Sequence, residues 1–121
     1  MKHRTLLLST LVNLKACEGQ VNLFKQTFGD SVDITPELCK QHEHNFNFHW
    51  AAEHLLSASA WRIYEETRAS ALKIYEETCA PARKIFDETG DSAWKIYKES
   101  IAWKIYKETC ATTFANLYIG E

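Results

Sequence analysis

The chain has 121 residues, of which 45% are apolar and 25% are charged, and its formal net charge is −2 at pH 7. This length suits one domain with a modest core, and the composition is that of an ordinary globular chain. The near-neutral charge argues against a nucleic-acid partner, which needs a basic surplus or patch, and no apolar run approaches the roughly 20 residues of a membrane span.

The N-terminal end allows two interpretations. Lys2-His3-Arg4 precedes an apolar stretch, and Leu14-Lys15-Ala16-Cys17 has a faint likeness to a lipoprotein cleavage site, an order typical of an export signal. A lysine just before such a site is unusual. We therefore expect a short amphipathic helix, capped by Ser9 or Thr10, rather than a signal peptide.

The remainder of residues 1–59 is predicted to form short helices around one extended segment. A helix is expected from about Ala16 to Phe28, because its apolar residues recur at three- and four-residue spacing and Gly29 follows as a stop. Residues 30–34 alternate between polar and apolar types and are predicted to be extended. Thr35-Pro36-Glu37 is a strong helix start, and we expect that helix to reach about Glu43 and another to span Phe48 to Leu56.

The cysteines are scattered along the chain, and no two of them form a C-x-x-C pair. The helical composition can supply a core without disulfide bonds, so we expect reduced thiols and a cytoplasmic protein. The four residues are Cys17, Cys39, Cys79 and Cys110.

Residues 60–118 contain five copies of one sequence motif, namely Ala60–Thr67, Ala71–Thr78, Ala82–Thr89, Ala93–Ser100 and Ala102–Thr109. A period of 11 residues matches three helical turns at about 3.67 residues per turn. The alanine, isoleucine, aromatic and hydroxyl positions of each repeat then share one face, which we expect to be the core stripe. Basic and acidic residues four apart, such as Lys73 and Glu77, form a solvated face.

Two breaks are expected within these repeats. Pro81 lacks an N–H group, and Gly90-Asp91-Ser92 is typical of a helix stop followed by a new cap. We therefore predict helices near 58–79, 81–89 and 92–115. The fold class is an all-α small multi-helix bundle, folded back at Pro81 and Gly90, in which 60–121 packs with 1–59 as one domain. A single kinked rod is the alternative.

The last two repeats are out of phase. Ile96 and Ile105 are nine residues apart instead of 11, and nine helical steps rotate a side chain by about 180°. A continuous last helix would therefore present apolar residues on two sides, one of which must meet the domain or a partner. Aromatic residues anchor interfaces, so the expected partner-binding residues are Trp94, Tyr97, Ile101, Trp103 and Tyr106.

One polar cluster has the residue types of a metal site, with four histidines between His42 and His54 and Cys39 nearby. The five-residue step from His49 to His54 places these two rings about 140° apart on a helix, which does not suit chelation. We expect no metal and no cofactor. No glycine-rich phosphate loop and no nucleophile motif is present, so an enzyme is not expected.

Three segments carry a resemblance to a known group of proteins. Leu14-Lys15-Ala16-Cys17-Glu18-Gly19, Phe48–Leu56 and Ala80-Pro81-Ala82-Arg83-Lys84-Ile85-Phe86 resemble small uncharacterised bacteriophage and prophage proteins that have an Ala-Cys-Glu-Gly module and tandem Ala-Pro-Ala-x-Lys-Ile-Tyr repeats. The resemblance covers most of the chain and implies no activity, catalytic residue or cofactor. Here only one repeat keeps the proline.

The functional expectation is a non-enzymatic, phage-type protein-interaction module that acts in the host cytoplasm on a protein or complex, such as a defence or restriction system. Self-association as a homodimer would satisfy the same two-sided helix. Two other hypotheses remain open, namely a small metal-dependent enzyme built on the His42–His54 cluster and a structural helical spacer.

Overall fold

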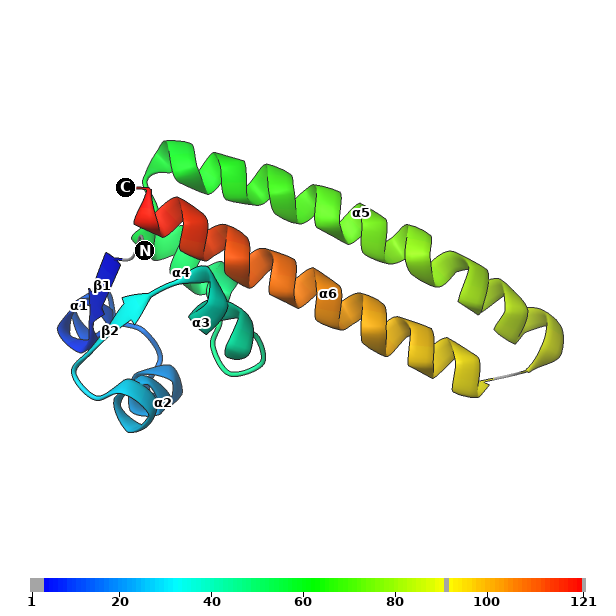
Figure 1. Ribbon diagram of the computed structural model, residues 1–121, viewed down its shortest axis with the longest axis horizontal. Coiled ribbons are helices and arrows are strands. Elements are labelled where there is room, and N and C mark those ends of the chain that lie inside the picture. Colours follow the sequence, from blue (N-terminus) through cyan, green and yellow to red (C-terminus); the bar gives the residue numbers. More distant parts are fainter. Residues whose placement is uncertain (1–3, 91, 121) are drawn as a thin grey trace.

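The computed structural model describes residues 4–90 and 92–120. It is mostly helical, with a small head from which two long antiparallel helices extend as an arm (Figure 1). The expected all-α class is confirmed, apart from one two-stranded ribbon. The elements are β1 (Arg4–Leu7), α1 (Leu8–Asn13), α2 (Glu18–Phe28), β2 (Ser31–Ile34), α3 (Pro36–Gln41), α4 (Phe48–Leu55), α5 (Ala58–Thr89) and α6 (Ser92–Ile119).

The N-terminal ribbon was not expected. β1 pairs antiparallel with β2, so that Arg4 lies opposite Ile34 and Leu7 opposite Ser31. The extended segment at 30–34 was predicted, but its partner strand is only four residues long and is defined by this long-range pairing. The cap at Ser9 or Thr10 was also wrong, because α1 begins at Leu8, directly after the strand, with no side-chain cap.

The other short helices follow their local signals. Gly29 ends α2 with a φ of 81°, a left-handed value that glycine adopts without strain. The Thr35 hydroxyl accepts a hydrogen bond from the Leu38 backbone N–H at 3.1 Å, with Pro36 in the first turn of α3. The Asn47 side chain caps α4 in the same way, accepting from the Trp50 N–H at 3.0 Å.

The expected fold-back at Pro81 is wrong. α5 continues through the proline as one helix. Pro81 and Glu77, whose carbonyl loses its helical donor, are both exposed, so water can satisfy that carbonyl. Cys79 and Ala82, on either side of the proline, are buried and hold both halves of α5 in the arm.

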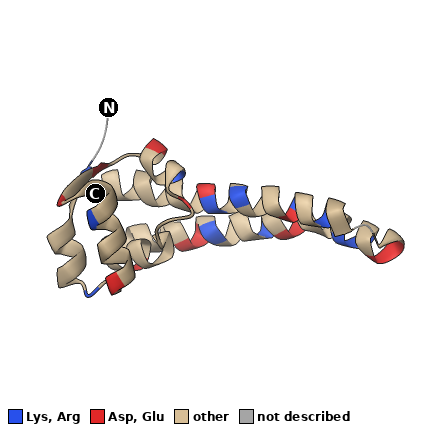
Figure 2. Ribbon diagram, turned by 90° about the horizontal axis from the view of Figure 1, so that it is seen from below, with Lys and Arg blue, Asp and Glu red and all other residues tan. Residues whose placement is uncertain are grey.

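The chain turns back at Gly90, which ends α5 in the left-handed conformation with a φ of 74°. Asp91 of the predicted stop lies outside the described residues. α6 then runs beside α5 and returns to the head, so that both chain ends lie at the same end of the molecule (Figure 1). Charged residues are spread along both helices of the arm, whereas uncharged segments dominate the head (Figure 2).

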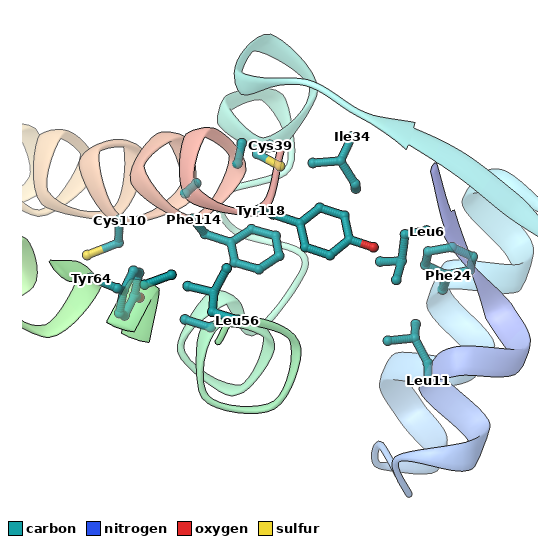
Figure 3. Close-up of a cluster of buried hydrophobic side chains, with 14 residues drawn as sticks. Leu6, Leu11, Phe24, Ile34, Cys39, Leu56, Tyr64, Cys110, Phe114 and Tyr118 are labelled. Atoms are coloured by element: carbon teal, nitrogen blue, oxygen red, sulfur yellow. The ribbon is translucent and has the colours of Figure 1, made fainter. Parts of the chain in front are cut away.

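The core lies in the head and combines both parts of the sequence (Figure 3). Phe114 and Tyr118 from the end of α6 are buried there with residues of the first 60 positions. Arg4 ties the two chain ends together, since it donates a hydrogen bond to the Tyr118 carbonyl at 3.2 Å and lies over the Tyr118 ring. The other large members of this cluster are Leu6, Leu11, Phe24, Ile34, Cys39, Leu56 and Tyr64.

The expected core stripe of the repeats is only half correct. Its alanines at 60, 71 and 82 are buried, and Tyr64 is 1% exposed, but Ile63 is 50% exposed and Ile74 is 60% exposed. Adjacent helical residues point about 100° apart. A helix that packs against one neighbour buries one narrow side, so burial of the aromatic position turns the isoleucine before it towards solvent.

Candidate functional site

The nine-residue step rotates the outer part of α6. Ala102 is 4% exposed, and Tyr106 one turn later is half-buried beside α5. The equivalent residues of the preceding repeat, Ala93 and Tyr97, are exposed. The half-turn difference expected from the sequence is therefore present, and it leaves an aromatic side chain on the outside of the arm.

Polar residues take the inner side of α6 near the tip of the arm. Arg83 of α5 donates a hydrogen bond from Nε to Oε1 of Glu99 at 3.1 Å. The Lys95 ammonium lies 4.7 Å from the centre of the Phe86 ring, a cation–π contact. The two helices are thus joined at the tip by charged groups, while Ile96 is 62% exposed.

An aliphatic groove runs along one side of the seam between α5 and α6. Its apolar lining includes Ile74 of α5 with Ile101 and Ile105 of α6, and its volume is about 270 Å³. All three isoleucines are at least 42% exposed. We call this feature the arm groove. Ile74 and Ile105 were expected in the core stripe, and this prediction is wrong because both are exposed surface residues.

Trp94 and Tyr97 lie further towards the tip than the arm groove. Their rings stack with centroids 5.9 Å apart, and the Lys98 ammonium lies 4.9 Å from the centre of the Trp94 ring. Lys98 also lines the arm groove. On a helix, Trp94 and Ile101 are seven residues apart and so lie on nearly the same side. The exposed apolar surface thus continues from the groove to Trp94.

Trp103 and Tyr106 form a second aromatic cluster with Tyr75 of α5. The Tyr75 ring centroid is 5.5 Å from that of Trp103 and 6.3 Å from that of Tyr106. Trp103 does not line the arm groove but a separate hollow that also includes Phe48 and Tyr64. The five predicted partner-binding residues are therefore divided between two sides of the arm.

The second hollow lies where the arm meets the head, and its volume is about 370 Å³. Cys110 lines it, and burial raises the pKa of this thiol above its ordinary value. Burial likewise raises the pKa of the Tyr64 and Tyr106 phenols. These groups hold their protons at neutral pH, and a protonated thiol is a poor nucleophile. Tyr64 and Cys110 are also buried members of the core cluster.

The histidines of the predicted metal cluster point to different neighbours. His42 packs against the Phe28 and Phe46 rings, and His54 stacks on Trp50 with ring centroids 4.4 Å apart. His44 contacts the buried Glu43 carboxylate at 2.6 Å, whereas His49 lies beside Trp61. Within residues 4–90 and 92–120, no group of three or more His, Cys, Asp or Glu side chains is arranged to hold a metal ion.

Comparison with protein-family models, curated proteins and solved structures returned no match. The resemblance to phage proteins therefore stays a prediction from the sequence. Among the described residues, all four cysteines are free thiols, and no helix combines the length and the apolarity that crossing a membrane requires.

Proposed function

We propose that this protein is a non-enzymatic protein-interaction module that binds a helix of its partner in the arm groove. The observation that supports this proposal is the line of exposed isoleucines, Ile74, Ile101 and Ile105, beside the α5–α6 seam. Isolated apolar residues are common on surfaces, but a lined groove between two helices is a typical place for partner docking.

The geometry of the arm favours a helix as the bound element. Two helices side by side present ridges of side chains with a groove between them, and a third helix can lay its apolar residues into that groove. Helices docked in this way use anchors at three- and four-residue spacing. Ile101 and Ile105 lie one helical turn apart on the α6 wall of the groove, and Ile74 lines it from α5, so the groove has apolar side chains for such anchors to contact.

The charges along α5 indicate what flanks the apolar residues of the partner. Each exposed isoleucine of α5 is followed three residues later by a glutamate, as in Ile63–Glu66, Ile74–Glu77 and Ile85–Glu88. Residues three apart are neighbours on a helix surface. A row of acids thus borders the isoleucines. Lys98 lines the groove from α6, so the partner helix is proposed to carry an apolar stripe with basic residues only on the edge that faces α5.

The cellular setting of the proposal comes from the sequence resemblance alone. We propose a phage-encoded protein that acts in the cytoplasm of the host on a protein complex such as a defence or restriction system. A second copy of the chain is the competing occupant, because homodimerisation would cover the same isoleucines.

Site-specific photo-crosslinking tests the proposal. Benzoylphenylalanine introduced in place of Ile74, inside the groove, is expected to capture one distinct protein in the natural host. The same probe at Lys73 is the matched control, because this neighbouring exposed residue points about 100° away. Ile101→Asp, which puts a charge into the groove at an exposed position, is expected to abolish capture from position 74.

Three outcomes contradict the proposal. Equal capture from positions 73 and 74 would show that the arm groove is not selective. Capture that persists in the Ile101→Asp variant would remove the groove from the interface. An adduct of twice the mass of the chain, matched by a dimer in light scattering, would assign the groove to a second copy instead.

A further inference from the structure

The head contains an apolar cavity of about 310 Å³ that is separate from the arm groove. It is a pocket that opens to the surface rather than a closed void of the packed interior, because exposed residues are part of its lining. This volume lies at the lower end of the range for small-molecule pockets, about 300–1,000 Å³. The large apolar side chains that line it include Phe24, Phe28, Phe46, Phe48, Trp50 and Phe114, of which Phe24 and Phe114 are labelled in Figure 3.

One side of the cavity reaches the surface between α1, α2 and the loop before α4. The exposed residues Lys15, Cys17 and Asn47 line it there, together with Gln20. The amide of Gln20 bridges the rim, since its oxygen accepts from the Asn47 N–H at 2.9 Å and its nitrogen donates to the Asn45 carbonyl at 3.3 Å. The side-chain amide of Gln20 therefore has both of its polar atoms hydrogen-bonded to the backbone at the rim.

Lys15 is the charged residue in the lining of the cavity. Its backbone φ is 60°, in the left-handed region that a side chain rarely adopts. The Lys15 N–H donates to the Val12 carbonyl and the Ala16 N–H to the Leu11 carbonyl, the pair of bonds that closes a helix end at which glycine is usual. This chain thus places a lysine where the backbone favours glycine, directly beside an apolar cavity.

The rest of the lining is apolar or already hydrogen-bonded. The His42 ring lies edge-on to Phe28, and its Nδ1 pairs with the side-chain amide of Asn45 at 3.1 Å. The buried Cys39 thiol keeps its proton, because burial raises its pKa to about 12. Lys15 forms no ion pair with another residue of 4–90 or 92–120. The cavity therefore has an apolar interior, and the exposed Lys15 is the charged residue among those that line it.

We propose that this cavity binds a small amphiphilic carboxylate, with its apolar body among the aromatic rings and its carboxylate paired with Lys15. The volume suits a single short acyl chain or one substituted ring and excludes a lipid with two long chains. This site is independent of the arm groove, since none of the residues that line the groove lines the cavity.

Titration of the full-length protein with decanoate, below its micelle-forming concentration, tests the inference by ¹⁵N-resolved NMR. Chemical-shift changes are expected at Phe24, Phe28 and Trp50 and not at Ile74 or Ile101 of the arm. Decanol has the same chain without the charge. It is expected to bind about tenfold more weakly, the difference that one charge-assisted hydrogen bond typically makes.

Two variants separate the charge from the cavity. Lys15→Gln is expected to reduce decanoate affinity about tenfold and to leave decanol affinity unchanged. Lys25→Gln is the matched control, because Lys25 is an exposed lysine of α2 that does not line the cavity. Both changes are at exposed positions, so folding, checked by circular dichroism, is expected to be preserved.

Several results would overturn the inference. Absence of shifts at the cavity residues at millimolar decanoate would show that the cavity takes no such ligand. Equal affinity for decanoate and decanol, or an equal effect of the two lysine variants, would exclude recognition of the carboxylate by Lys15. Shifts confined to Ile74 and Ile101 would show nonspecific adsorption on the arm.

Discussion

Arg83 and Glu99 join the two helices of the arm through a 3.1 Å hydrogen bond from the guanidinium Nε to the carboxylate Oε1. This bond raises the pKa of Arg83 above its ordinary value. The acid at the same position of earlier repeats, such as Glu77, is exposed on α5. Glu99 faces α5 because the nine-residue step in α6 turns the polar side of its repeat inward. The contact is thus a consequence of the phase change.

Charge reversal tests this contact. Glu99→Arg is expected to speed hydrogen exchange of the backbone amides at the tip, residues 82–100, because two like charges then face each other across the seam. The effect is expected to be modest, since the pair is partly exposed. Arg83→Glu combined with Glu99→Arg should restore the original rates. Equal exchange in the single and double variants would mean that the pair does not hold the tip.

Large-to-small substitutions distinguish the true core from the stripe expected from the repeats. Phe114→Ala removes a ring that is 2% exposed and is expected to lower the free energy of unfolding by about 3–5 kcal/mol. Ile63→Ala, at a half-exposed position of the expected stripe, should change it by less than about 0.5 kcal/mol. Urea unfolding measures both. Comparable losses for the two variants would contradict the burial of one and the exposure of the other.

Local signals were sufficient to predict most of the helices. Helix caps and stops depend only on residues close in sequence, as at Gly29, Thr35-Pro36 and Asn47. The ends of α2, α3 and α4 were therefore predictable to within about two residues. Pro81 has a local effect as well, but burial of Cys79 and Ala82 against α6 outweighs it. The β1–β2 pairing and the continuity of α5 depend on distant contacts, which a single sequence does not show.

The candidate site was predictable only in part for the same reason. The phase difference within α6 can be predicted from the sequence, because Ile96 and Ile105 are nine residues apart instead of 11. Whether an isoleucine lies at the seam or beside it depends on how many neighbours the helix has. The arm has two helices rather than the expected three, so each isoleucine beside an aromatic residue is left at the edge of the seam, and Ile74 becomes part of a groove.

Alkaline pH is expected to destabilise the fold through Cys39. This thiol is 3% exposed, and burial raises its pKa from 9.0 to about 12. Between these values the unfolded chain loses the proton and the folded chain keeps it, so a rise in pH favours unfolding. The stability contributed by the neutral thiol is complete below pH 9 and falls by up to about 1.4 kcal/mol per pH unit above it.

Urea unfolding from pH 8 to 11 measures this slope. Cys39→Ala is expected to flatten the fall in stability relative to the parent, while Cys17→Ala, which removes an exposed thiol, should leave the curve unchanged. Tyrosines that titrate at alkaline pH contribute to all three proteins and cancel in the comparison. Parallel curves for the parent and Cys39→Ala would show that Cys39 does not control the alkaline limit.

The phase change in α6 is itself open to a direct test. Two alanines inserted between Ser100 and Ile101 restore the 11-residue spacing and rotate the preceding repeat by about 200°. Tyr97 then faces α5, and Glu99 turns away from Arg83. Because Tyr97 is 57% exposed in the parent, its partial burial is expected to raise the free energy of unfolding by about 1 kcal/mol, measured in urea. Crosslinking from position 74 should become weaker, because Trp94 moves away from the end of the groove.

The same two alanines inserted between Asp91 and Ser92 are the matched control. They lengthen the connection between α5 and α6 but leave the phase between the last two repeats unchanged, so Tyr97 is expected to stay exposed and crosslinking from position 74 to persist. If the insertion after Ser100 lowers stability while leaving crosslinking intact, the outward rotation of Trp94 and Tyr97 serves the packing of the arm. If it raises stability and weakens crosslinking, the nine-residue step lowers the stability of the arm but keeps Trp94 and Tyr97 on the surface, where a partner can contact them.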